Sequence, residues 1–171
     1  MNSRLQLTLF LPAEQATEIE SLRMVLDPVQ ANLIAAHVTF AREDELAGIE
    51  WSHLQKRFDL LFNEELSLTF GGPEPFDGHG VLLPCIAGEE EFFALRARVL
   101  GSCVLRRQRP HITLAHPRNP RAPGNEPAIH ARVPQHTVVR FASVSRIKQE
   151  PAAPWQVLSH HPLHGLPRRD A

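Results

Sequence analysis

Two tetrapeptides in the sequence share one pattern of histidine, aliphatic residue, threonine and large apolar residue. They are HVTF at 37–40 and HITL at 111–114, and we call them the HxT motifs. An unperturbed imidazole titrates near pH 6.5, so one histidine can accept a proton while a second donates one. Threonine hydroxyls and imidazole N–H groups can hold phosphate oxygens. Brought together, the two motifs would supply acid–base chemistry on a phosphodiester without a metal or other cofactor.

One HxT tripeptide alone is weak evidence, because any amphipathic strand with an exposed histidine gives the same pattern. Successive strand side chains point to opposite faces, so His37 would share a face with Thr39, and His111 with Thr113. The apolar residues between them can pack beneath helices. The polar pairs must then face a cleft, because burying an unpaired imidazole or hydroxyl is unfavourable.

The same succession of elements surrounds each motif. In the first half, hydrophobic periodicity predicts strands at 4–12, 33–41 and 65–70 and helices at 13–26 and 43–62. In the second half it predicts strands at 78–87, 110–116, 137–149 and 155–161, a helix at 88–102, and a proline-rich stretch with room for one short helix at 117–136. The motif histidines are 74 residues apart, and this shift relates the flanking elements to within one or two residues. We therefore predict an internal duplication that places the motifs at equivalent positions of two lobes.

Composition is that of an ordinary globular chain. Its 171 residues suit one domain, or two small lobes with a shared core, and a net charge of −1 gives no global basic field for binding long nucleic acid. The two cysteines, Cys85 and Cys103, form no CxxC pair, so we expect no disulfide framework and a cytoplasmic location. The apolar run in 1–12 is too short to span a membrane and lacks the features of a signal peptide.

The paired motifs resemble those of the two-histidine (2H) phosphoesterase superfamily, in its 2′-5′ RNA ligase and cyclic phosphodiesterase branch. That family carries two H-x-[ST]-φ tetrapeptides, φ being apolar, and PHITL at 110–114 matches its second motif particularly well. The resemblance implies an α+β fold with two pseudo-symmetric lobes, each a mainly antiparallel sheet with helices on its outer face, enclosing a central cleft. It implies one such bilobal domain over 1–171, acting as a monomer without a membrane partner.

The resemblance also implies roles for the motif residues. His37 and His111 would act as general acid and base on 2′,3′-cyclic phosphate ends of RNA or on small cyclic nucleotides, with either histidine in either role. Thr39 and Thr113 would bind the phosphate. The first motif departs from the family because it continues into ARED at 41–44, rather than into an apolar residue and glycine.

Basic residues flank the second motif. Arg106, Arg107 and Arg109 precede it, and His116 and Arg118 follow it in AHPRN. They would either steer an anionic substrate to the cleft and contact it, or belong to ordinary polar loops. We take Arg109, His116 and Arg118 as candidate substrate-binding residues.

Two other functions compete with cyclic phosphodiester hydrolysis. The same groove would serve a protein that binds or ligates RNA ends in 2′-5′ linkage with little hydrolytic turnover. A zinc hydrolase could use HHPLHG at 160–165, but Pro162 breaks any helix there and no acid or cysteine nearby completes a ligand set. We therefore expect no metal site.

Overall fold

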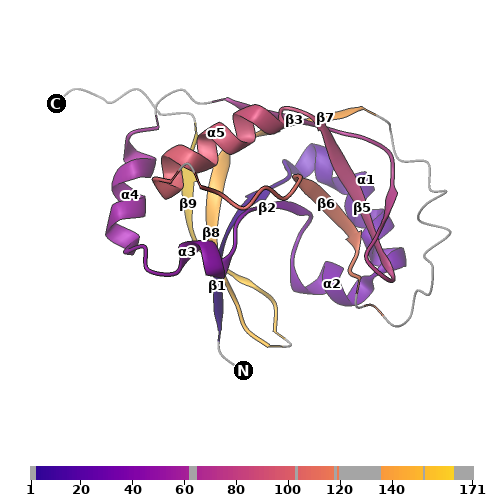
Figure 1. Cartoon of the computed structure of the whole chain (residues 1–171). Helices are drawn as coiled ribbons and strands as arrows, with labels where there is room; N and C mark the ends of the chain where they lie inside the picture. Colours follow the sequence, from indigo (N-terminus) through magenta and orange to yellow (C-terminus); the bar gives the residue numbers. More distant parts are fainter. Residues whose placement is uncertain are drawn as a thin grey trace.

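A computed structural model describes residues 3–61, 65–102, 104–117, 119, 136–151 and 153–163. In this part of the chain, nine strands form one curled antiparallel sheet in the order β7-β3-β5-β6-β2-β1-β8-β9, and β4 pairs with β5 (Figure 1). The strands are β1 (Arg4–Phe10), β2 (His37–Ala41), β3 (Leu66–Phe70), β4 (Glu74–Phe76), β5 (Gly80–Ala87), β6 (His111–Ala115), β7 (Thr137–Phe141), β8 (Ser143–Gln149) and β9 (Gln156–Pro162). The short helix expected within 117–136 lies outside the described residues.

The sheet consists of two four-stranded halves that meet where β2 pairs with β6. In one half β2 is followed across the sheet by β1, β8 and β9, and in the other β6 is followed by β5, β3 and β7. The halves are related as the duplication predicts, with β1 corresponding to β5 and β2 to β6. The α+β class and the two pseudo-symmetric halves are confirmed.

The third strand of each predicted repeat lies in the other half of the sheet. Strand β3, from the first repeat, pairs with β5 of the second, and β8, from the second repeat, pairs with β1 of the first. The single long strand predicted over 137–149 is therefore wrong. The chain leaves one half at Ala142, so that β7 pairs with β3 and β8 pairs with β1. The exchange joins both repeats into one sheet.

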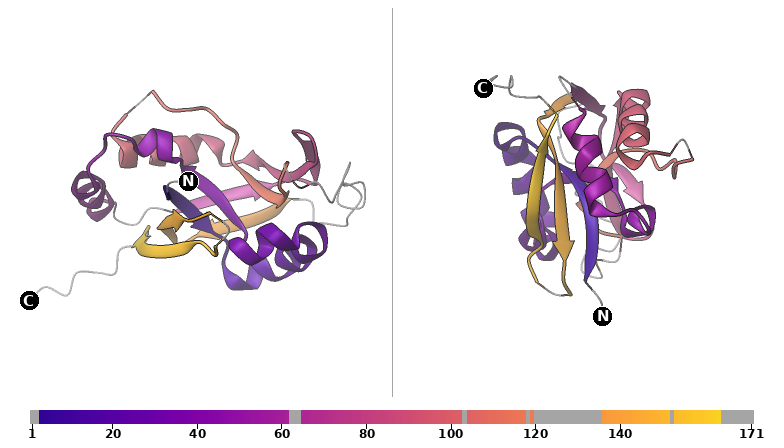
Figure 2. Two further views of the ribbon diagram at one scale, coloured as in Figure 1. Left: turned by 90° about the horizontal axis from the view of Figure 1, so that it is seen from below. Right: turned by 90° about the vertical axis from the view of Figure 1, so that its left-hand side faces the viewer.

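Five helices are described: α1 (Ala13–Leu26), α2 (Pro28–Leu33), α3 (Glu43–Leu46), α4 (Trp51–Asp59) and α5 (Glu89–Leu100). The helices α1 and α2 lie together at one side of the molecule, and α3 and α4 lie at the other (Figures 1 and 2). None of the helices in the described ranges has the length and apolar character needed to cross a membrane.

One predicted helix and one predicted strand need correction. The helix expected over 43–62 is divided into α3 and α4, and Gly48 between them has a φ of +80°, which helical backbone does not adopt. The strand expected from residue 33 begins only at His37, because Leu33 is the last residue of α2 and residues 34–36 connect the helix to the strand. Asp27 caps α2 by accepting a hydrogen bond from the Gln30 backbone N–H (3.1 Å), and Pro28 stands at the first helical position.

The apolar face of the two motif strands forms the centre of the core. Val38, Phe40 and Ile112 have no exposed surface, and Leu114 has 1 %. Phe40 packs edge-on against Phe92 of α5, with ring centroids 5.7 Å apart. This packing fixes which face of β2 and β6 is buried, and so turns the opposite face toward solvent.

Candidate active site

The histidine and threonine of each motif lie on the face of the sheet opposite the core. Along β2 and β6 the side chains alternate between partly buried and fully buried, with His37 and Thr39 on one strand and His111 and Thr113 on the other partly buried. This alternation is what the sequence pattern predicts for two half-exposed strands. All four side chains line one cleft of about 1070 Å³.

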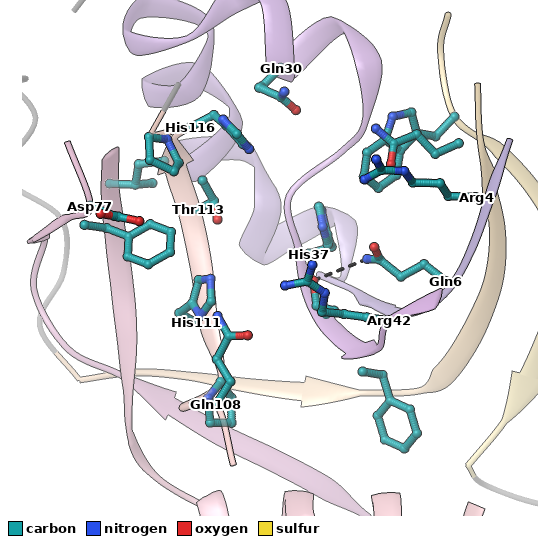
Figure 3. Close-up of a pocket in the computed structure, with 18 of the residues that line it drawn as sticks. Arg4, Gln6, Gln30, His37, Arg42, Asp77, Gln108, His111, Thr113 and His116 are labelled. Carbon is teal, nitrogen blue, oxygen red and sulfur yellow. Dashed lines mark hydrogen bonds between the residues drawn. The ribbon is translucent and has the colours of Figure 1, made fainter. Parts of the chain in front are cut away.

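The register between the strands determines how the four side chains are arranged. Val38 pairs with Ile112 in an antiparallel bridge, which places His37 opposite Thr113 and His111 opposite Thr39. Directly opposite residues of an antiparallel pair have Cβ atoms about 4.5–5.5 Å apart, and diagonal ones about 7–8 Å. The two imidazoles therefore stand on the diagonal of a compact patch, and Figure 3 shows His37 and His111 bordering the same cavity from two strands.

Each motif histidine is held by a carbonyl two residues earlier in the chain. His37 Nδ1 lies 2.8 Å from the Ala35 oxygen, and His111 Nδ1 lies 3.0 Å from the Arg109 oxygen. A carbonyl can only accept, so Nδ1 carries the proton in both rings and Nε2 of the neutral imidazole has a free lone pair. The tether thus fixes the tautomer that presents Nε2 as the acid–base atom.

Burial lowers the pKa of both histidines. The pKa of His37 falls from 6.5 to about 4, mainly through desolvation, against the opposing effect of its hydrogen bond to Ala35. The charges of Arg23 and His111 lower it further. Desolvation also lowers the pKa of His111, against its hydrogen bond to Arg109. Both imidazoles are therefore mainly neutral at pH 7, and a phosphate anion between them would raise both pKa values.

Aromatic rings stand beside each motif histidine. Phe10 and Trp155 have ring centroids 6.3 Å and 6.0 Å from that of His37. Phe76 lies 5.3 Å from His111. Sequence patterns do not single out Phe10 or Trp155, because their proximity to His37 depends on the pairing of β1 with β2 and on the turn between β8 and β9.

The arginines before the second motif differ in their surroundings. Arg106 and Arg109 line the cleft, whereas Arg107 lies away from it, 5.7 Å from the ring of Phe93. Arg106 forms a partly exposed ion pair with Asp44 (3.3 Å).

Arg109 is held by Nε, which donates to the Cys85 carbonyl (2.7 Å), and its Nη1 lies 3.7 Å from Glu74. Its guanidinium is thus fixed at the edge of the cleft. Arg118 lies outside the described residues.

His116 also lines the cleft, one residue beyond the end of β6. Its backbone N–H donates to Asp27 Oδ2 (2.9 Å), and the other oxygen of the same carboxylate caps α2. Asp27 is buried, so this carboxylate fixes the end of β6 against α2. In Figure 3 the His116 and Gln30 side chains lie at one end of the cavity and Gln108 at the other.

The polar residues of the cleft that are absent from the sequence-based candidates include three from β1 and the end of β2. They are Arg4 and Gln6 of β1, and Arg42, which directly follows β2. Arg42 stands in the ARED segment where the first motif departs from the family pattern, so a signal for it was present. Gln6 has no such signal, because its place in the cleft depends on the register between β1 and β2.

Among the described residues, no group of three or more histidine, cysteine, aspartate or glutamate side chains could hold a metal ion. The two histidines of β9 belong to different environments. Nδ1 of His160 lies 2.8 Å from Ser145 Oγ, whereas His161 is buried and stacks on Phe58, with ring centroids 4.3 Å apart. His164 of the same segment lies outside the described part of the chain.

Comparison with known proteins identifies the fold. No protein-family model and no curated protein matches the sequence. Among solved structures, E. coli LigT in complex with phosphate matches with a TM-score of 0.64 and 18% sequence identity, over 95% of this chain and 98% of that one. A structure described as a phosphoesterase matches with a TM-score of 0.61 and 18% identity, over 96% and 100%. E. coli LigT with 3′-AMP matches with a TM-score of 0.62 and 15% identity, over 95% and 99%. The chain thus shares the LigT fold along nearly its whole length.

Proposed function

We propose that this protein is a metal-independent 2H-type phosphodiesterase acting on 2′,3′-cyclic phosphate ends of RNA or on small cyclic nucleotides. The observation that carries the proposal is the diagonal pair of histidines in one cleft, each with Nδ1 against a carbonyl and Nε2 available. Two such groups on either side of a phosphorus atom provide a base for the entering oxygen and an acid for the leaving one.

In this proposal His37 is the base and His111 the acid. Desolvation lowers the pKa of both histidines, and that of His37, which falls to about 4, is lowered further by the charges of Arg23 and His111, so we place a single proton shared by the pair on His111. His37 Nε2 takes a proton from water as the water oxygen bonds to phosphorus. The bond from phosphorus to one ribose oxygen breaks, and that oxygen receives the proton of His111. The ring opens to a phosphomonoester, His37 releases its proton to solvent, and His111 takes one up from solvent, which restores the starting state.

Thr39 and Thr113 donate hydrogen bonds to the non-bridging oxygens of the phosphate. Charge on these oxygens grows as the water attacks, so fixed donors there favour the transition state over the bound substrate. The cross-strand register supports this assignment, because each threonine stands opposite the histidine of the other motif. A phosphate bound in the cleft would therefore have one threonine hydroxyl and one imidazole on each of its two sides.

Substrate binding beyond the phosphate is assigned to Arg109, His116 and Arg118. Arg109 and His116 border the cleft, which supports contacts with a further phosphate, a ribose or a base. The whole of 1–171 would act as one bilobal unit and as a monomer. The comparisons add support, because E. coli LigT has been crystallised with phosphate, 3′-AMP and ATP, all of which carry phosphate.

The test is turnover of the four 2′,3′-cyclic mononucleotides and of a short RNA with a cyclic phosphate end. Purified protein should open the ring with one product regiochemistry, and excess EDTA should leave the rate unchanged. Binding of the RNA end without turnover would instead favour an RNA-end binding or ligating protein. Activity lost in EDTA and restored by zinc would contradict the metal-independent mechanism.

A further inference from the structure

We propose that Gln6 is a positioning residue that turns the Thr39 hydroxyl toward the substrate phosphate, an inference that rests on the proposed function of the cleft. Gln6 Nε2 lies 2.9 Å from Thr8 Oγ1 and 3.3 Å from Thr39 Oγ1. Figure 3 shows the Gln6 side chain in the cavity on the same side as His37, with its hydrogen bond drawn as a dashed line.

The chemistry of the amide decides the direction of both hydrogen bonds. An amide nitrogen carries two N–H donors and no acceptor, so both threonine hydroxyls must accept from Gln6. A hydroxyl that accepts from the amide keeps its own proton for another acceptor. Thr8 is fully buried, whereas Thr39 is only partly buried and lines the cleft. The Thr39 proton is thereby directed to an acceptor in the cleft, where the phosphate oxygens would lie.

The backbone places the amide within reach of Thr39. Thr8 of β1 stands directly opposite Thr39 of β2, and Gln6 is on the same face two residues before Thr8. The register of β1 against β2 shifts between Leu7 and Thr8. Irregularities of this kind re-aim nearby side chains, and this one lies beside Gln6.

Within the described part of the chain, the second motif lacks this support. Thr113 stands opposite Leu82 of β5, which is 9% exposed and carries no hydrogen-bond donor in its side chain. Leu82 thus takes the place that Thr8 has beside Thr39. The two motifs have the same residue pattern but are not equivalent. Thr39, which stands beside His111, has its hydroxyl oriented in advance, so it should contribute more to phosphate binding than Thr113.

The experiment measures binding of inorganic phosphate by calorimetry and, separately, kcat/KM for a 2′,3′-cyclic mononucleotide. Gln6→Ala should weaken phosphate binding and lower kcat/KM about tenfold, since a hydrogen bond to a charged group has about that effect. Gln6→Glu keeps the shape but cannot donate, and its carboxylate would accept the Thr39 proton and repel phosphate. Its loss should exceed that of Gln6→Ala. Gln156→Ala, which removes an exposed amide from β9, should change neither quantity.

A double-mutant cycle separates positioning from general damage to the strand. In a Thr39→Val background, Gln6→Ala should cause no further loss, whereas in a Thr113→Val background it should cause its full loss. Equal losses in both backgrounds, wild-type phosphate binding by Gln6→Glu, or no phosphate binding by the wild-type protein would overturn the proposal. If the double-mutant cycle gives the expected result for phosphate binding but no cyclic nucleotide is hydrolysed, the positioning role of Gln6 is supported and the proposed function is contradicted.

Discussion

Val38 and Ile112 pair with each other across the junction of β2 and β6. Each is the second residue of its motif, and the two are related by the same shift of 74 residues as the histidines. The local two-fold relation between the halves therefore passes between these residues. A single bridge thus converts two separate sequence motifs into one patch in which each histidine faces the threonine of the other motif.

The lowered pKa values predict an acidic optimum for catalysis. The reactive free protein has His37 neutral and His111 protonated. Activity should fall below about pH 4, where His37 gains a proton, and should fall again at higher pH as His111, whose pKa is lowered by desolvation, loses its own. The measurement is kcat/KM for a 2′,3′-cyclic mononucleotide against pH, and its two limbs belong to the coupled pair. A flat profile, or a maximum above about pH 8, would contradict the assignment.

The same pKa shift predicts acid sensitivity of the fold. In the unfolded chain His37 titrates near 6.5 and in the folded protein near 4, so the unfolded state binds the proton more tightly. The contribution of neutral His37 to the free energy of unfolding is therefore fully present above about pH 6.5 and is lost as the pH falls toward about 4. His37→Gln should reduce this loss by an amount on the order of 1–3 kcal/mol.

Urea denaturation at about pH 7.5 and about pH 4.5 measures this effect on the free energy of unfolding. His53→Gln is the matched control, because His53 is exposed on α4 and should leave the pH dependence unchanged. If His37→Gln and the wild-type protein lose the same stability on acidification, His37 is not desolvated as the structure indicates.

The arginines at the cleft predict a salt-dependent effect on substrate binding. Arg106→Ala and Arg109→Ala should each raise KM severalfold at low salt, with a smaller effect at high salt, because their charges act through a screened field. Arg107→Ala is the matched control, since Arg107 lies outside the cleft against Phe93. Equal effects of all three substitutions, or effects that do not change with salt, would show that the position in the cleft is not what matters.

Much of the fold followed from local patterns. Strand alternation placed His37 and Thr39 on one face, and the burial of Val38 and Phe40 on the other bears this out. Local signals for the division of the 43–62 helix and for α2 were also present, as Gly48 and as Asp27 followed by Pro28. Around Gly48 the hydrophobic period continues from α3 into α4, which favours one helix over two.

The remaining features depend on contacts between distant segments. The exchange of β3 and β8 between the halves, and the break at Ala142 that permits it, are set by which strands pair, and local periodicity does not encode this. The role of Gln6 depends likewise on a register with Thr39, 33 residues away. Local chemistry predicted the motif residues, whereas the residues that orient them required the sheet.

If the two motifs form one acid–base site, removing the two histidines singly and together should give losses that do not multiply. With a 2′,3′-cyclic mononucleotide in excess EDTA, His37→Ala and His111→Ala should each lower kcat/KM by at least about 10²-fold. The double variant should be little worse than either single one, because groups that act as a unit are non-additive. Full activity in either single variant, or losses that multiply in the double variant, would contradict a shared site.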